Sequence, residues 1–279
     1  MEIRIAIIQY PGSNCEYETS RAVAKAGMIP EIFRWNKDPK ILSEFSGYII
    51  PGGFSYQDRV RAGAIAAKKS IVDSIMKEAM IGKPVLGICN GAQVLVEAGM
   101  IPGLAWGRLE MALAPNMMKG RIGFYCDWVY VKVSNTTNAF TRFFRKDEIF
   151  PIPIAHAEGR FVTKEEGLLE DLIKNNQIVL RYCDINGEII EDFPINPNGS
   201  IYNIAGLCNP SGNVFALMPH PERAAVVRQI PDDLGGRFGK VRYRAWGNVA
   251  KMKKGASGLK IFESMRRYIE DGVWDRTIC

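Results

Sequence analysis

The 279-residue sequence predicts an α/β fold with a mostly parallel central sheet and helices on both faces. Short apolar runs alternate with helix-like segments along the first hundred residues, which is typical of a parallel sheet covered on two sides. One apolar run leads directly into Cys89, which is followed at once by a further helix-like segment. A strand that turns sharply into a helix at a reactive side chain is a nucleophile elbow and indicates the same fold class.

The first half of the chain contains the alternating elements in order. Apolar runs predict strands at residues 3–9, 30–35, 48–50 and 85–88. Helical spacing predicts helices at residues 16–26, 61–81 and 93–98. Glycine and proline clusters interrupt these elements, and they mark the turns between strand and helix.

The second half is richer in strands and ends with a helix. We expect strands at residues 121–133, 149–162, 177–183, 201–207 and 213–218. We expect helices at residues 165–175 and 257–271. Residues 224–255 lack a clear period and are expected to form an irregular, basic insertion. The chain contains no repeat and no linker, so residues 1–279 are expected to form a single domain.

The bulk composition is that of an ordinary globular protein, with 47% hydrophobic and 24% charged residues. No apolar run approaches the ~18 residues that a membrane-spanning helix needs. The N-terminus indicates a first strand and not a signal peptide, so a cytoplasmic location is expected. The six cysteines are scattered without a Cys-x-x-Cys pair, which predicts neither a metal site nor disulfides. They are Cys15, Cys89, Cys126, Cys183, Cys208 and Cys279.

The positive charge of the chain is concentrated in one segment. The net charge is +6, and residues 223–254 alone carry nine Lys or Arg against two Asp. A nucleic-acid-binding protein would show a groove-reading element or an aromatic platform, and neither is present, so no nucleic acid is expected. Two explanations remain open for the basic segment: a solvated insertion, or a docking surface for a partner.

Cys89 is the strongest candidate for a nucleophile. Glycines at positions 87 and 91 allow the sharp turn, and the following helix places its N-terminus at the sulfur. The dipole and the free N–H groups at that end favour a thiolate and, later, an oxyanion. The alternative is a buried cysteine that acts only as a small hydrophobic residue.

The chain offers two candidate bases, since it contains only two histidines. Each has a glutamate two residues later, in the pairs His156–Glu158 and His220–Glu222. In extended backbone such residues point to the same side, so either pair would provide an imidazole oriented by a carboxylate. His220 is favoured because it follows the apolar run 213–218, and active sites of parallel sheets lie beyond the C-terminal ends of strands.

A glycine pair follows the strand at residues 48–50. Paired glycines allow backbone N–H groups to approach a ligand closely. The N–H groups of Gly53 and Asn90 would then form a two-donor oxyanion hole, with one donor from each strand end.

Three motifs together resemble the class I (triad) glutamine amidotransferases: GICNGAQ at 87–93, PGGFSY at 51–56 and MPHPER at 218–223. Four others resemble, more narrowly, the glutaminase subunits of formylglycinamide ribonucleotide amidotransferases. These are PGSNC at 11–15, PIAHAEGRF at 153–161, NPNGS at 196–200 and IAGLCNPSG at 204–212.

The resemblance implies that glutamine is hydrolysed through a thioester on Cys89, with His220 as base and Glu222 as its orienting group. It further implies that the glutamine pocket is lined by Gly52, Gly53, Phe54 and Gln93. Four residues lie in family motifs without an assigned role and are candidates for a partner or secondary site: Asn14, His156, Glu158 and Arg160.

The resemblance also implies partners. The chain has no Gly-x-x-x-x-Gly-Lys-Ser/Thr loop, so no cofactor is expected in it. ATP and Mg are expected on a large synthetase subunit, which acts with a small accessory subunit on formylglycinamide ribonucleotide. No membrane contact is expected. The alternatives are a glutaminase for a different synthetase, a cysteine hydrolase on a similar fold, and a non-catalytic interaction subunit.

Two positions depart from the family pattern. Gln57 stands where the family usually has glycine; a left-handed backbone there would cost about 1–2 kcal/mol. Ala92 replaces a larger residue that commonly precedes the glutamine at position 93.

Overall fold

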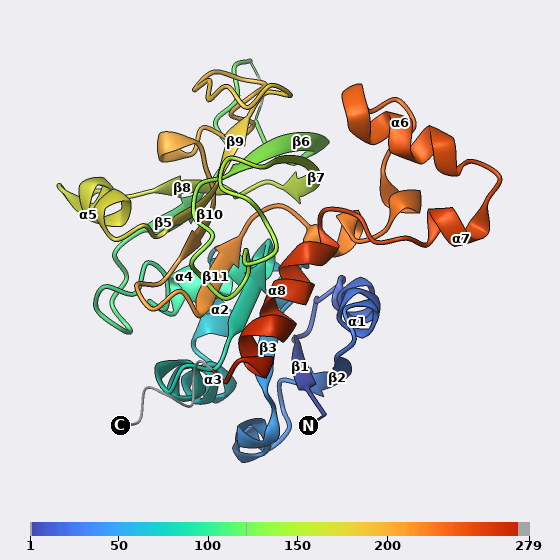
Figure 1. Cartoon of the computed structure of the whole chain (residues 1–279). Helices are drawn as coiled ribbons and strands as arrows, with labels where there is room; N and C mark the ends of the chain where they lie inside the picture. Colours follow the sequence, from blue (N-terminus) through green and yellow to red (C-terminus); the bar gives the residue numbers. More distant parts are fainter. Residues whose placement is uncertain (1, 121, 273–279) are drawn as a thin grey trace.

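The computed structural model describes residues 2–120 and 122–272; Met1, Arg121 and residues 273–279, with Cys279, lie outside it. A nine-stranded sheet forms its centre, in the order β2-β1-β3-β4-β11-β10-β9-β6-β7 (Figure 1). Its strands are β1 (Arg4–Gln9), β2 (Ile29–Arg34), β3 (Gly47–Ile50), β4 (Val85–Ile88), β6 (Tyr125–Val133), β7 (Ile149–His156), β9 (Ile178–Cys183), β10 (Ile204–Cys208) and β11 (Val214–Leu217). A separate small sheet pairs β5 (Ala112–Ala114) with β8 (Arg160–Val162).

The strand directions confirm a mostly parallel sheet. The five strands from β2 to β11 are mutually parallel. The remaining pairings are antiparallel, so β10 and β6 run opposite to the other seven strands of this sheet. The carboxyl ends of β3, β4 and β11 therefore lie side by side at one edge of the sheet, the edge formed by strand ends, where ligands bind in sheets of this kind.

Helices cover both faces of the parallel half. The α-helices of the described ranges are α1 (Glu16–Lys25), α2 (Ala64–Ala67), α3 (Ser70–Met80), α4 (Asn90–Glu97), α5 (Leu168–Lys174), α6 (Gly236–Ala245), α7 (Val249–Met252) and α8 (Leu259–Glu270), of which α5, α6 and α7 lie away from this half (Figure 1). Helices α1 and α8 contact each other on one face, whereas α2, α3 and α4 lie on the other (Figure 1). Because both faces are covered, β3, β4 and β11 are buried along their whole length.

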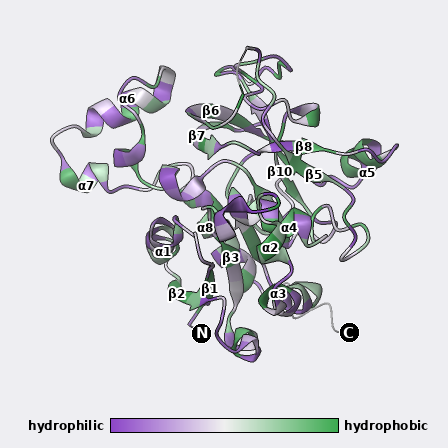
Figure 2. Cartoon of the chain, turned by 180° about the vertical axis from the view of Figure 1, so that it is seen from behind, coloured by the Kyte–Doolittle hydropathy of each residue, from purple (hydrophilic) through white to green (hydrophobic). Residues whose placement is uncertain are grey.

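The core is apolar and the outer helix faces are polar. Hydrophobic residues gather on the central strands, and hydrophilic residues lie along the outside of the helices (Figure 2). Within the described ranges, no helix is long and apolar enough to cross a bilayer.

Three predicted elements differ from the structure. The helix expected at 61–81 is two helices, α2 and α3, which are separated at Lys69, where the backbone is extended. The strand-rich stretch 149–162 is broken between β7 and β8. The segment 224–255 is not irregular, because it contains α6 and α7. Phe238, Val241 and Ala245 fall at helical spacing on α6, and Phe238 contacts Tyr130.

Candidate active site

The chain turns from β4 into α4 at Cys89, as an elbow requires. The backbone of Cys89 adopts φ 51° and ψ −105°, an uncommon conformation for a residue with a side chain. Gly91 packs so closely on β3 that a Cβ there would lie 1.8 Å from the carbonyl oxygen of Ile50. Only glycine fits at that position, and the close packing holds the sulfur at the edge of the sheet.

His220 reaches the same edge from the neighbouring strand. Strands β11 and β4 are parallel with Leu217 opposite Ile88, so the residues that follow them emerge together. His220 Nδ1 and Glu222 Oε1 are 2.6 Å apart, and both side chains are almost fully buried. With Nδ1–H donating to the carboxylate, Nε2 has no hydrogen-bond partner among the residues that the structure describes.

The environment of His220 favours its protonated form. Burial alone would lower the pKa of the imidazole, but the Glu222 carboxylate and the thiols of Cys89 and Cys15 raise it well above its usual value. The raised pKa favours the imidazolium form, which can donate a proton to a leaving group.

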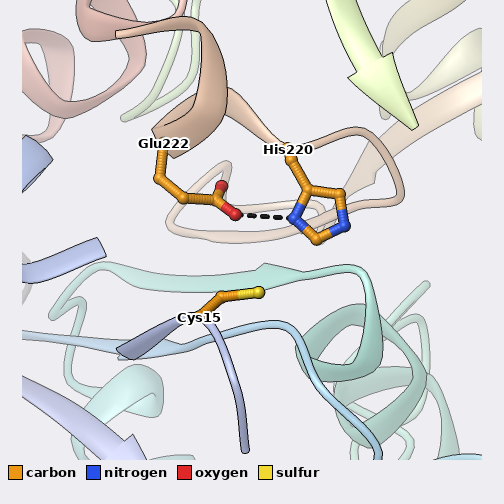
Figure 3. A group of neighbouring side chains, drawn as sticks. All are labelled: Cys15, His220 and Glu222. Carbon is orange, nitrogen blue, oxygen red and sulfur yellow. Dashed lines mark hydrogen bonds and ion pairs between the residues drawn. The ribbon is translucent and has the colours of Figure 1, made fainter. Parts of the chain in front are cut away.

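Cys15 belongs to this site, although the sequence did not single it out. A Cβ on Gly52 would lie 2.8 Å from His220 Cε1, 3.1 Å from Cys15 Sγ and 3.5 Å from Cys89 Cβ, so these groups surround one point. The Cys15 sulfur faces the His220–Glu222 pair (Figure 3) and accepts a hydrogen bond from Arg223 Nη2 at 3.2 Å. In the sequence, only its place in the motif at residues 11–15 pointed to Cys15 as a site residue.

The same cluster has the atom types of a metal site. Cys15, His220 and Glu222 offer ligand atoms that lie within 4.8 Å of one another. A metal that took both His220 Nδ1 and the facing carboxylate oxygen would have to separate the 2.6 Å pair. The geometry of that pair instead fits an imidazole oriented by a carboxylate.

The predicted oxyanion donors lie at the ends of β3 and β4. In the described part of the chain, neither the Gly53 nor the Asn90 backbone N–H has an acceptor. The loop 12–14 packs against Gly53, with Asn14 N donating to Gly52 O at 3.2 Å. Asn14 contacts the glycine pair through this backbone, and its side chain is exposed.

Polar side chains continue the site beyond the nucleophile. Asn90 Nδ2 donates to Gln93 Oε1 at 2.9 Å and to Asp58 Oδ1 at 3.3 Å, and Gln93 Nε2 donates to the Glu158 carbonyl at 2.6 Å. Burial, with the nearby Glu158 charge, raises the pKa of Asp58 to about 6. Neither the Asp58 nor the Glu158 carboxylate forms an ion pair with a described residue. Asp58 is a second site residue that the sequence missed, since only the fold places it beside Glu158.

The loop that follows the glycine pair has a left-handed backbone at Gln57. Tyr56, Gln57 and Asp58 have φ of 53°, 60° and 52°, all in the left-handed region. The strain predicted for a non-glycine residue therefore applies at Gln57. Phe54, from the same loop, is half exposed beside Phe124, at the rim of the site.

The second histidine does not form the alternative pair. His156 Nδ1 lies 3.0 Å from Asn116 Oδ1, and burial, with the charge of His220, lowers its pKa to about 3. It is therefore neutral, and Glu158 instead accepts from Ala62 N. Arg160 lies on β8, where its Nε donates to Pro115 O, away from the sulfur.

Comparison with known proteins identifies the family of the chain. The profile of the CobB/CobQ-like glutamine amidotransferase domain matches residues 2–269. Phosphoribosylformylglycinamidine synthase subunit PurQ of Methanothrix thermoacetophila is 48% identical over 276 residues, which cover 96% of this chain and 99% of the relative. The same subunit of Aquifex aeolicus is 43% identical over 224 residues, 80% of this chain and 92% of the relative.

A solved structure shares the whole fold. The structure of PurLQS from Thermotoga maritima contains a chain with a TM-score of 0.70 and 35% identity, and the match covers 96% of this chain and 100% of that one. The elbow cysteine, the buried His–Glu pair and the family profile lead to one conclusion. The chain belongs to the family of CobB/CobQ-like glutamine amidotransferases.

Proposed function

We propose that Cys89, His220 and Glu222 hydrolyse glutamine to glutamate and ammonia. The observation that carries the proposal is the meeting of an elbow cysteine with a buried, carboxylate-oriented histidine at one sheet edge. A nucleophile, an acid–base group and an orienting carboxylate are the parts that acyl transfer through a thioester needs.

The steps follow from the positions of these groups. The Cys89 thiolate attacks the carboxamide carbon, and the oxyanion that forms is stabilised by the N–H groups of Gly53 and Asn90. His220 gives its proton to the departing nitrogen, so ammonia leaves and a γ-glutamyl thioester remains. His220, now neutral, takes a proton from water as the water attacks the thioester, and glutamate leaves. Glu222 holds the imidazole in one orientation throughout.

The substrate pocket extends from the sulfur toward Asp58. Gly52, Gly53, Phe54 and Gln93 line the side nearest the reacting carboxamide, by the resemblance and by their positions. Asp58 and Glu158 are two neighbouring carboxylates, and the nearby Arg61 is paired with Glu97, so the α-ammonium group of glutamine is the charge that suits them.

The chain is the glutamine amidotransferase component of phosphoribosylformylglycinamidine synthase, and it supplies ammonia for de novo purine biosynthesis. Its partners are the large synthetase subunit and the small accessory subunit of that complex, as in PurLQS. We place ATP and Mg on the synthetase subunit, since none of the steps above needs a cofactor, and we place the complex in the cytoplasm.

The site is closed in the isolated chain. Cys89 is 6% exposed and His220 is 2% exposed, so glutamine needs an opening movement to reach them. Ammonia released into water is mostly protonated near neutral pH and is then no nucleophile. A closed site that opens in the complex would couple hydrolysis to the acceptor.

The test uses the three subunits together, with amidine formation measured from glutamine and from ammonium salt. Cys89→Ala is expected to abolish glutamine-dependent synthesis and leave ammonia-dependent synthesis unchanged. Cys126→Ala, at an exposed cysteine outside the site, is the matched control. If Cys89→Ala keeps glutamine-dependent synthesis, the proposal is wrong.

A further inference from the structure

The basic segment forms an arm that extends from the body of the molecule. We define the arm as residues 226–255, which include α6 and α7 (Figure 1). Its two ends meet in a short stem, where Val226 bridges Gly255 and Val227 N donates to Lys254 O at 3.0 Å. The stem begins four residues after Glu222, so the arm is a direct continuation of the catalytic loop.

A positively charged cavity lies between α1 and the base of the arm. Its volume is about 270 Å³. Four cationic side chains line it, two from α1 and two from the arm: Arg21, Lys25, Arg228 and Lys253. None of the four forms an ion pair with a residue of the described ranges. The two acidic lining residues are engaged elsewhere, Glu222 with His220 and Glu18 near Arg223.

The cavity is connected to the catalytic loop by hydrogen bonds. Gln229, which lines it, donates from Nε2 to the Glu222 carbonyl at 2.9 Å and accepts from Val226 N at 2.9 Å. Glu222 itself lines the cavity. An occupant of the cavity would therefore contact the loop that orients the imidazole.

These features do not fit a merely solvated insertion. Four like charges around one cavity repel one another, which a solvated face avoids by spreading its charges. The arm also exposes large aromatic side chains, with Tyr243 80% and Trp246 67% accessible. Exposed tyrosine and tryptophan beside arginine are typical of protein–protein contact sites.

We propose that this cavity and the adjacent arm bind an acidic segment of the synthetase subunit. The inference rests on the proposed function, which requires that subunit beside the active site. Carboxylate side chains of the segment would pair with the four cations, and the exposed aromatic residues would pack against its surface.

Charge reversal on each wall separately tests the proposal in the full chain. The variants are Arg228→Glu with Lys253→Glu on the arm, and Arg21→Glu with Lys25→Glu on α1. The matched control is Lys164→Glu with Lys174→Glu, exposed charges at and beside α5, which lies at the opposite side of the molecule (Figure 1). Affinity for the purified synthetase and accessory subunits is measured by biolayer interferometry at low and high salt.

Each cavity variant is expected to raise Kd about tenfold or more and to flatten its salt dependence, whereas the control stays near wild type. Basal glutaminase activity of the isolated variants should not change. The proposal is overturned if both cavity variants bind like the control. It is also overturned if the cavity variants bind the other subunits like wild type and lose only self-association, RNA retention or inorganic phosphate binding. If the wild-type complex makes no amidine from glutamine, the proposed function fails instead.

Discussion

The hydrogen bond between His220 Nδ1 and Glu222 decides which histidine acts. Both histidines are buried, but the carboxylate raises the pKa of His220, whereas His156 has only an amide oxygen and a lowered pKa. A buried imidazole is neutral unless a negative charge faces it. One contact therefore separates a proton donor at neutral pH from a structural histidine.

Replacing Glu222 with glutamine keeps the shape of the side chain and removes its charge. The pKa of His220 should then fall, since burial is no longer opposed by the carboxylate. We expect glutaminase turnover to drop about a hundredfold or more. The loss of activity at rising pH should also begin at lower pH than in wild type. Glu18→Gln is the control, and an unchanged pH profile for Glu222→Gln would contradict this role.

We propose that Asp58 binds the substrate, although its charge destabilises the folded protein. Its pKa is raised from 3.8 to about 6, so its charge is unfavourable in the folded state, and stability falls as pH rises through that window. Asp58→Asn should therefore unfold at higher denaturant concentration than wild type above pH 6, with the difference vanishing below pH 4. It should also raise KM for glutamine. Denaturation at both pH values and steady-state kinetics test this, and an unchanged KM would sink the substrate role.

At the scale of elements, the elbow depends on close contact between α4 and β3. A methyl group at position 91 would lie 1.8 Å from the Ile50 carbonyl oxygen, and backbone on both sides prevents relief. We expect Gly91→Ala to destabilise the fold by more than about 3 kcal/mol or to prevent folding. Gly235→Ala, where φ is −60° and the nearest atom to a Cβ would be 3.8 Å away, is the control for a lost glycine. Equal stability of the two variants would contradict the packing argument.

The elements that the sequence predicted well are those with local signals. Strands β1, β3, β4 and β11 are apolar runs bounded by glycine or proline, and each lies where it was expected. The break between α2 and α3 was missed because residues 64–70, where Lys69 is extended, include neither glycine nor proline. Helix α6 was missed although Phe238, Val241 and Ala245 lie at helical spacing, because its two glycines and its basic residues suggest an irregular segment.

The site residues also divide into those with a local sequence signal and those without one. Cys89, His220 and Glu222 are marked by their neighbours in sequence, and the structure brings them to one edge. Cys15 and Asp58 reach the site through loops whose positions depend on the whole sheet, so no local pattern marked Asp58, and only the 11–15 motif pointed to Cys15.

At the scale of the molecule, a buried active site and an arm joined to it indicate control by the partner. The isolated chain should be a poor glutaminase that accelerates when the synthetase and accessory subunits bind. Gln229 provides the link, so Gln229→Ala should reduce this acceleration. Glutaminase rates with and without the other subunits test the prediction. Equal rates for the wild-type chain in both states would exclude it.

The central claim is that Cys89 attacks glutamine. The most direct test is site-resolved mass spectrometry after treatment of the three-subunit complex with a glutamine-mimicking diazoketone, with free glutamine as competitor. We expect one modified residue, Cys89, and protection by glutamine, while Cys15 stays unmodified despite its position beside His220. Labelling at another residue, or labelling of Cys89 that glutamine does not block, would contradict the claim.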